Sequence, residues 1–194
     1  MNFLGHLYFS NNNIELMYAN LYGDHIKGRN LDHLPNVVQK GIKLHRSIDN
    51  YIDHHPKVIE LMHQLYPELP KVTGIAIDLF FDYLLAKNWA NYHSQPFEIF
   101  LHEFYSYEPI YWNDYSNEYK EFIVKMRTFK WMNYYKEFEG LKKSCEGVSA
   151  RLSFPNELVN APNVFLKHEK IITSCFKEYM KEAIHFFDQK ENNN

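Results

Sequence analysis

His45 and Asp49, whose side chains can bind metals or transfer protons, lie four positions apart in an otherwise apolar pattern. They continue the series Val38, Ile42 and precede Ile52 at spacings of three and four. Such spacings place side chains on one side of a helix, so the imidazole and the carboxylate are expected to face inward together. A histidine and an aspartate arranged in this way can share a metal ion, as facing helices of bundles commonly do.

Three further carboxylates and one imidazole interrupt apolar stripes elsewhere. Asp78 and Asp82 are four apart in a segment that is apolar nearly all round, and Asp24 ends the stripe of a preceding segment. His6 lies among apolar residues near the start of the chain. Unpaired buried carboxylates are costly and repel one another, so several in one small core require a cation between them. The sequence therefore predicts a divalent metal held by Asp24, His45, Asp49, Asp78 and Asp82, with His6 nearby.

Mixed imidazole and carboxylate ligation suits Mn, Fe or Zn, and a set rich in carboxylates favours the harder ions. The alternative for each residue alone is structural. A histidine on an apolar face is more often a hydrogen-bonded core residue than a ligand, and Asp82 could pair with a nearby lysine or arginine. This alternative is weaker for the whole set, because it must hold for every member inside one core.

Basic residues lie close to these positions in the sequence. Lys27 and Arg29 follow Asp24, and Lys40, Lys43 and Arg46 surround His45. Lysine and arginine neutralise the charge that develops on phosphoryl oxygens, so a metal beside them would suit a phosphate ester. The alternative is an ordinary solvated helix face.

The composition favours one helical domain. The chain has 194 residues, 45% of them hydrophobic, with 15 Tyr, 15 Phe, 7 Gly and 8 Pro. So few turn-forming residues argue against a sandwich or barrel, and no repeat or linker marks a second domain, so residues 1–194 are expected to form one all-α domain. No apolar run approaches the roughly 20 residues of a membrane span, and no signal peptide is recognisable. Two cysteines without metal-binding or redox spacing fit the cytoplasm, and a net charge of −3 does not suggest nucleic-acid binding.

The helices that must position these side chains can be outlined. Thr73 is expected to cap one of them, and Asn113 or Asp114 to cap another. The pattern predicts helices near residues 2–9, 14–26, 35–53, 56–66, 73–91, 96–107, 113–138, 141–152 and 163–188.

Four ordered blocks in the first half of the chain resemble those of the acyl carrier protein phosphodiesterases. The opening MNFLGHLYFS is similar to their MNFLAHLHLA, and ANLYGDHIKGR is similar to their GNLLADFVRG. GIKLHRSIDNYIDHHPKV resembles their GI-x-x-HR-x-ID-x-x-TD-x-x-P block, and IAIDLFFDYLLAKNW resembles their D-x-x-x-DH-x-L-x-x-x-W block. The chain departs from these patterns at Tyr83, where the family often has His, and it lacks an HD dipeptide because Arg46 follows His45.

The resemblance implies an all-helical fold like that of the HD-domain metal phosphohydrolases. It implies hydrolysis of the phosphodiester of holo-acyl carrier protein to the apo-protein and 4′-phosphopantetheine, with Mn²⁺ as activator and Mg²⁺ or Fe²⁺ as other candidates. The matching positions are His6, Asp24, Arg29, His45, Arg46, Asp49, Asp78 and Asp82.

In the expected mechanism the metal activates a water, and a carboxylate or His6 acts as general acid or base. Arg46 and Arg29 hold the phosphoryl oxygens. The catalytic residues are thus expected to be His6, Asp24, His45, Arg46 and Asp49. Lys27, Arg29, Lys40 and Lys43 are expected to bind the phosphate or to form a docking face for the acidic acyl carrier protein.

Two alternatives stay open. The same site could hydrolyse another phosphoester, as in other HD-like phosphohydrolases. The chain could also be a non-catalytic helical module that binds a partner, with its polar stripes acting as structural ion pairs. The sequence does not indicate an oligomeric state.

Overall fold

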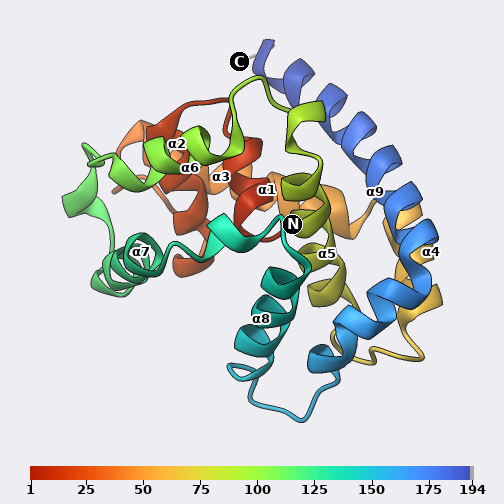
Figure 1. Ribbon diagram of the computed structural model, residues 1–194. Coiled ribbons are helices and arrows are strands. Elements are labelled where there is room, and N and C mark those ends of the chain that lie inside the picture. The colour runs from red at the N-terminus through yellow and green to blue at the C-terminus, as the bar shows by residue number, and fades with distance from the viewer. Residues whose placement is uncertain (193–194) are drawn as a thin grey trace.

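The N-terminal quarter of the chain forms three helices that pack on one another. They are α1 (Phe3–Tyr8), α2 (Ile14–Leu21) and α3 (Asn36–Asp53), and α2 is followed directly by the short 3₁₀ helix η1 (Tyr22–His25). The computed structural model describes residues 1–192, and 73% of it is helix, with no strand in that range (Figure 1). The all-α prediction is confirmed, whereas the more specific likeness to HD-domain proteins stays a prediction. Residues 193–194 of the predicted domain lie outside the described residues.

The remaining elements, which include the central helix of the fold, follow in chain order. They are α4 (Pro56–Leu65), α5 (Thr73–Lys87), η2 (Trp89–Asn91), α6 (Phe97–Ser106), η3 (Trp112–Asp114), α7 (Asn117–Phe129), η4 (Trp131–Tyr134), α8 (Phe138–Ser149), η5 (Leu158–Asn160) and α9 (Ala161–Asn192).

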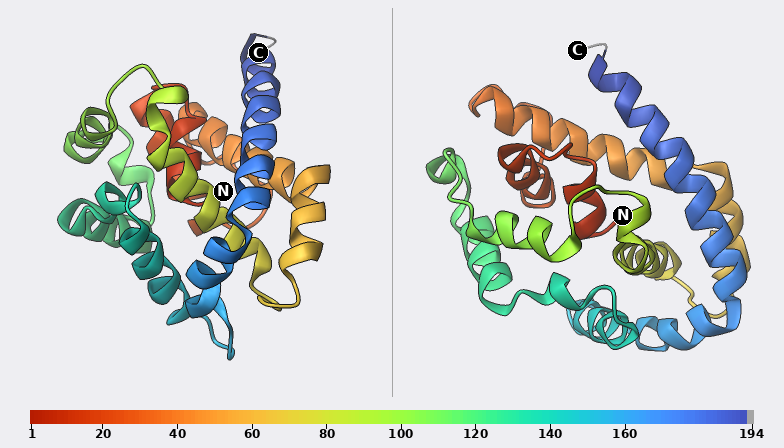
Figure 2. Two further views of the ribbon diagram at one scale, coloured as in Figure 1. Left: turned by 45° about the vertical axis from the view of Figure 1, so that its right-hand side comes forward. Right: turned by 45° about the horizontal axis from the view of Figure 1, so that its top comes forward.

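Helix α5 lies at the centre because its sequence is apolar on all sides. Eleven of its residues are buried, and it packs against α1, α4, α8 and α9. The two turned views show α9 running along the outside of the molecule beside α4 (Figure 2). A helix without a polar face is stable only when its apolar side chains are buried on every side.

Helices α2 and α3 approach closely through Gly41. A Cβ atom on Gly41 would lie 2.3 Å from the Cβ of Ala19, so a side chain there would push the helices apart. This close contact brings η1, at the end of α2, onto the middle of α3, and the two elements are in contact.

Several predicted boundaries are wrong for local reasons. The helix expected over 113–138 is three elements, because Lys130 adopts a left-handed conformation (φ 46°) that ends α7. Ser116 caps α7 instead of Asn113 or Asp114, and its hydroxyl accepts from the amide of Tyr119. Thr73 is not the N-cap of α5, a position that Val72 takes, and its hydroxyl donates instead to the carbonyl of Leu69 at 2.7 Å.

The other predicted helices agree in place but differ at their ends. The helix expected over 14–26 ends as an α-helix at Leu21 and continues as η1. The last helix extends to Asn192 and contains a kink at His168 (φ −114°, ψ 16°). No helix within residues 1–192 is both long and apolar enough to cross a membrane.

Candidate active site

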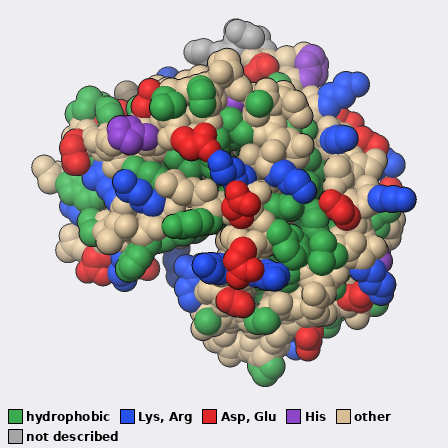
Figure 3. All heavy atoms as spheres, viewed as in Figure 1, with side chains coloured by type: hydrophobic (Ala, Val, Ile, Leu, Met, Phe, Trp, Pro, Cys, Tyr) green, Lys and Arg blue, Asp and Glu red, His purple; other side chains and the backbone are tan. Residues whose placement is uncertain are grey.

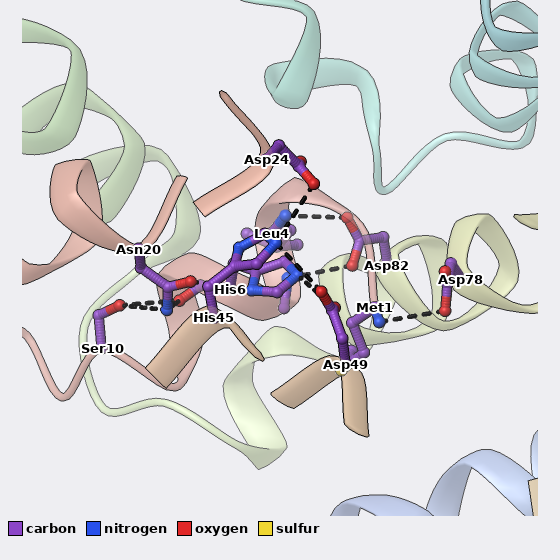
Figure 4. Close-up of polar contacts among 11 residues, drawn as sticks. Met1, Leu4, His6, Ser10, Asn20, Asp24, His45, Asp49, Asp78 and Asp82 are labelled. Carbon is purple, nitrogen blue, oxygen red and sulfur yellow. Dashed lines mark hydrogen bonds and ion pairs between the residues drawn. The ribbon is translucent and has the colours of Figure 1, made fainter. Parts of the chain in front are cut away.

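Four of the predicted polar residues converge at one place from three elements. His6 comes from α1, Asp24 from η1, and His45 and Asp49 from α3 (Figure 4). The Nε2 of His6 is 3.2 Å from Oδ1 of Asp49, and the Nε2 of His45 is 3.1 Å from Oδ2 of the same carboxylate. His45 Nε2 is also 3.2 Å from Oδ1 of Asp24. Both imidazoles therefore direct the same nitrogen toward carboxylates.

Asn20 determines which nitrogen of His6 carries a proton. The Asn20 amide nitrogen donates to the His6 carbonyl and to the Ser10 hydroxyl, so its Oδ1 is the atom 2.9 Å from His6 Nδ1. This oxygen can only accept, hence Nδ1 must donate to it. In a neutral His6 ring the lone pair therefore lies on Nε2, directed at the Asp49 carboxylate.

The two imidazoles stack, and this affects their protonation. Their ring centroids are 4.1 Å apart, with 14° between the planes. Burial lowers the pKa of His6, and the nearby charge of His45 lowers it further. Burial also acts to lower the pKa of His45, but its contacts with Asp24 and Asp49 outweigh burial and raise the pKa to about 9. In the metal-free protein the pair therefore holds one proton, and His45 carries it.

On the side of the ring away from the carboxylates, packing holds His45 in place. Its Nδ1 is buried and has no hydrogen-bond partner within residues 1–192. Its ring lies against Gly23 of η1, where a Cβ atom would be 2.3 Å from the ring Cγ. The absence of a side chain at Gly23 is thus a condition for this ring position.

The carboxylates of the cluster are held in the ionised form. Burial acts to raise the pKa of Asp49, but the contacts with His45 and His6 lower it well below the usual range. In the same way, the contact with His45 outweighs burial and lowers the pKa of Asp24. The side chains of Asp24 and Asp49 are 59% and 43% exposed, so both remain open to solvent and to a substrate.

Asp78 and Asp82 do not join this cluster, although the sequence pattern assigns them the same metal. Both oxygens of Asp82 accept backbone N–H groups at the start of α1, from Leu4 at 2.8 Å and Gly5 at 3.0 Å. Asp78 lies 3.1 Å from the amino nitrogen of Met1. Burial raises the pKa of Asp82 to about 7, despite these N–H contacts. The α5 pair therefore fixes the segment that carries His6.

A cavity of about 490 Å³ opens beside the cluster. Four carboxylates line it, those of Asp24, Asp49, Asp53 and Asp78, together with the imidazole of His6. Its size falls in the range of about 300–1,000 Å³ that small-molecule sites usually have. We call it the acidic cavity.

His6, His45 and Asp49 form a group that could hold a metal ion. One ligand atom from each lies within 4.8 Å of the others. An ion with bonds of about 2.1 Å has neighbouring ligand atoms roughly 3–3.4 Å apart, close to the contacts between these imidazoles and Asp49. The orientation of His6 also fits, because its Nε2 lone pair and the carboxylate both need a cation between them, and burial disfavours a proton there.

A model of the family described as acyl carrier protein phosphodiesterase matches residues 1–183. The chain belongs to this family. It is 26% identical over 152 residues to the acyl carrier protein phosphodiesterase of Enterobacter sp. (strain 638), a match covering 78% of this chain and 79% of that relative. The protein of the same name from Salmonella agona (strain SL483) is 25% identical over the same shares. No solved structure resembles the chain closely enough to match it. Membership indicates a hydrolase that acts on a phosphodiester bond.

In this member of the family the predicted basic residues do not line the acidic cavity. Arg46 is half-buried and donates to the carbonyl of Gly28 at 2.7 Å. Lys27, Arg29, Lys40 and Lys43 are exposed. Within the described chain, the one lysine or arginine lining the acidic cavity is Arg151, at the end of α8.

Sequence reasoning missed Asn20, Arg151 and the further cavity carboxylate, Asp53. Asn20 could have been found, because it lies three residues after Met17 and four before Asp24, on the same helix face. Arg151 carried no such signal. It lies 73 positions after Asp78 and more than 100 after the four residues of the cluster, between a helix and an irregular segment, and only the folding of α8 back onto α5 brings it near them.

Proposed function

We propose that this chain hydrolyses the phosphodiester linking 4′-phosphopantetheine to a serine of holo-acyl carrier protein, and that it requires a divalent metal, with Mn²⁺ the first candidate. The observation that carries the proposal is the convergence of His6, His45 and Asp49 beside the acidic cavity, which His6 and Asp49 line. Family membership supports the type of bond and, through the names of the relatives, the protein substrate.

His6, His45 and Asp49 would hold the metal, with Asp24 beside them. A divalent ion there would lower the pKa of a bound water and neutralise charge on the phosphoryl oxygens. Without a cation, four carboxylates lining the acidic cavity would repel a phosphodiester, because like charges in a partly buried site interact strongly.

Two carboxyl groups of the acidic cavity would take part in different proton transfers. Asp24 stays ionised because contact with His45 lowers the pKa of its carboxyl, and its exposed oxygens can accept a hydrogen bond from the attacking water and relay the proton of that water to solvent. Asp53 lines the same cavity, and burial together with the charge of Asp78 raises its pKa, which suits a proton donor. The water oxygen would bond to phosphorus as the bond to the serine oxygen breaks, and Asp53 would protonate that oxygen. The products are the apo-protein and 4′-phosphopantetheine.

The substrate protein would dock through charge. Acyl carrier proteins are acidic, and Lys27, Arg29, Lys40 and Lys43 are all exposed, as a steering surface requires. The face in Figure 3 shows lysines and arginines interspersed with acidic side chains, with no broad patch of one sign. Attraction would therefore come from local groups of lysines rather than from the net charge of −3.

The test is to incubate the metal-stripped protein with holo-acyl carrier protein, with and without Mn²⁺, and to measure the mass of the protein product. We expect apo-acyl carrier protein only when the metal is present. Asp49→Asn should remove this activity, and Asp114→Asn, which changes an exposed carboxylate outside the cluster, should retain it.

Full activity in a rigorously metal-free preparation would overturn the metal requirement. Hydrolysis of other phosphoesters with none of holo-acyl carrier protein would redirect the proposal to the alternative phosphohydrolase.

A further inference from the structure

A second cavity, of about 360 Å³, lies between η4 and α8 and adjoins the acidic cavity. The two cavities share four lining residues, which are Asn2, Phe3, Val148 and Arg151. A ligand whose reacting group lay in the acidic cavity could therefore extend into the second one without leaving the protein surface. On the face shown in Figure 3 the surface is hollowed between the regions of α7 and α8.

The second cavity differs from the first in chemistry. Its walls are largely the rings of Phe3, Trp131, Tyr134 and Tyr135. Its charged lining residues within the described chain are Lys143 and Arg151, both basic. We call it the aromatic cavity. Such a surface suits an uncharged, elongated group with apolar and amide portions that is attached to an anion.

Gly147 keeps the α8 side of the aromatic cavity open. A Cβ built on Gly147 would meet no atom within 4 Å, whereas one on Gly140, about two turns earlier, would collide with the backbone of Tyr134. Gly140 is therefore needed for packing, and Gly147 is not. A glycine inside an exposed helix lowers stability relative to alanine, so the fold gains nothing from having one at position 147.

Arg151 stands where the two cavities meet. Its Nε donates to the carbonyl of Gly147 at 3.2 Å, and it makes no ion pair with a carboxylate of the described residues. Its guanidinium thus retains donors that a phosphate at the junction could use. Arginine suits this role because its planar fork matches two phosphate oxygens at once.

We propose that the aromatic cavity binds the pantetheine arm of the substrate, and that Arg151 binds the phosphodiester at the junction. This inference rests on the proposed function. The serine side of the bond and the carrier protein then stay outside, and the arm lies along α8 past Gly147. The enzyme would recognise the arm as well as the protein that bears it.

The test compares the binding of free 4′-phosphopantetheine and of pantetheine, which lacks the phosphate, by calorimetry on the Mn²⁺-loaded protein. Gly147→Leu should fill the aromatic cavity and weaken both ligands by about 10-fold or more. Gly147→Ala is the matched control and should bind both as the original chain does. Leucine and alanine are both good helix formers, so neither change should unfold α8.

Arg151→Ala should change the affinity for one ligand and not for the other. It should weaken 4′-phosphopantetheine by about 10- to 100-fold through the lost charge-assisted hydrogen bonds, and leave pantetheine unchanged. Lys142→Ala, at an exposed position of α8 outside both linings, should change neither ligand.

Unchanged binding of both ligands by Gly147→Leu, or no binding of either by the original chain, would overturn the inference. Turnover separates this failure from that of the proposed function. If the original chain hydrolyses holo-acyl carrier protein and Gly147→Leu does so with an unchanged KM, the function stands and the arm site is wrong. If Gly147→Leu weakens both ligands but no phosphodiester is hydrolysed, the arm site stands and the function is wrong.

Discussion

Helices α3 and α5 each carry a pair of ionisable residues four positions apart, yet the two pairs have different surroundings. His45 and Asp49 on α3 contact another imidazole, that of His6, and lie beside a second carboxylate, that of Asp24. Asp82 on α5 faces the backbone N–H groups that begin α1, and Asp78 faces the amino nitrogen of Met1. Equal spacing thus places side chains on one face, but the element opposite decides what they bind.

The difference also shows how one pair supports the other. A helix N-terminus presents unpaired N–H groups and a partial positive charge, which a carboxylate satisfies. Asp82 does this for α1, a helix of six residues that is too short to be stable alone. Because α1 carries His6, the α5 pair positions a residue of the cluster to which it does not itself belong. The predictions below test this division between chemistry on α3 and anchoring on α5.

The largest effect is expected at the α3 pair. Asp49→Asn keeps the shape of the side chain but removes the charge that both imidazoles face, and should lower kcat by about 10²–10³-fold or more. Since Asp49 is 43% exposed, the melting temperature in chelator should change by no more than about 4 °C. Steady-state kinetics and thermal melts on the same preparation check both parts. A fall in melting temperature large enough to account for the lost activity would assign Asp49 to the scaffold.

For Asp82→Ala we expect the main effect on the melting temperature rather than on kcat. It leaves the amides of Leu4 and Gly5 without partners in the core, which costs about 2–5 kcal/mol, or roughly 5–15 °C in melting temperature. Asp114→Ala on the surface serves as the control. An unchanged melting temperature together with a complete loss of turnover and of bound metal would instead place Asp82 among the metal ligands, as its spacing in the sequence suggests.

Gly23→Ala tests whether packing against η1 positions the ring of His45. The new methyl group would have to displace the ring, so we expect a loss of about 1–3 kcal/mol of stability and a 10- to 100-fold fall in kcat/KM. The matched control is Gly74→Ala at the start of α5, where a Cβ meets nothing within 4 Å. Equal behaviour of the two variants would contradict this account of the ring.

The two pairs should also give the metal-free protein different responses to pH. The pKa of His45 is raised from 6.5 to about 9. Its contribution to the free energy of unfolding is therefore complete below pH 6.5 and is lost as the pH rises through 9. The pKa of Asp82 is raised from 3.8 to about 7, so folding takes up a proton and stability falls between about pH 4 and 7. Urea unfolding in chelator should show both declines, each about 3–4 kcal/mol at roughly 1.4 kcal/mol per unit of pKa.

The variants assign each decline to its helix. His45→Gln should abolish the upper decline and leave the lower one. Asp82→Ala should do the reverse. A profile that is flat from pH 6.5 to 9 in the original chain would mean that His45 does not hold the extra proton.

The smallest effect concerns a part of α3 outside the pair. Replacing Lys40 and Lys43 by Glu should raise KM for holo-acyl carrier protein by a few-fold, roughly 1 kcal/mol, and weaken its salt dependence. Hydrolysis of a small phosphodiester should not change. Equal losses on both substrates would show that these lysines act in the site or the fold rather than in docking.

Some features of this protein follow from its sequence alone. Apolar residues at spacings of three and four, with few glycines and prolines, determine an all-helical chain, because only helices bury such stripes. The same spacing indicates that His45 and Asp49 share a face, and four ordered motifs indicate the family. The helix ends were less predictable. Lys130, for example, ends α7 by adopting a left-handed conformation that lysine does not favour.

Only the tertiary structure decided which polar residues meet. Because α1 packs against α5, Asp82 accepts hydrogen bonds from backbone amides. Because η1 packs against α3, Asp24 contacts His45. Arg151 reaches the acidic cavity through the fold alone, while the basic residues that are close in sequence to the cluster do not line it. The physical reason is that helical periodicity is local and fixes the face on which a side chain lies. The partner on the other side comes from another element, whose packing depends on contacts made across the whole chain.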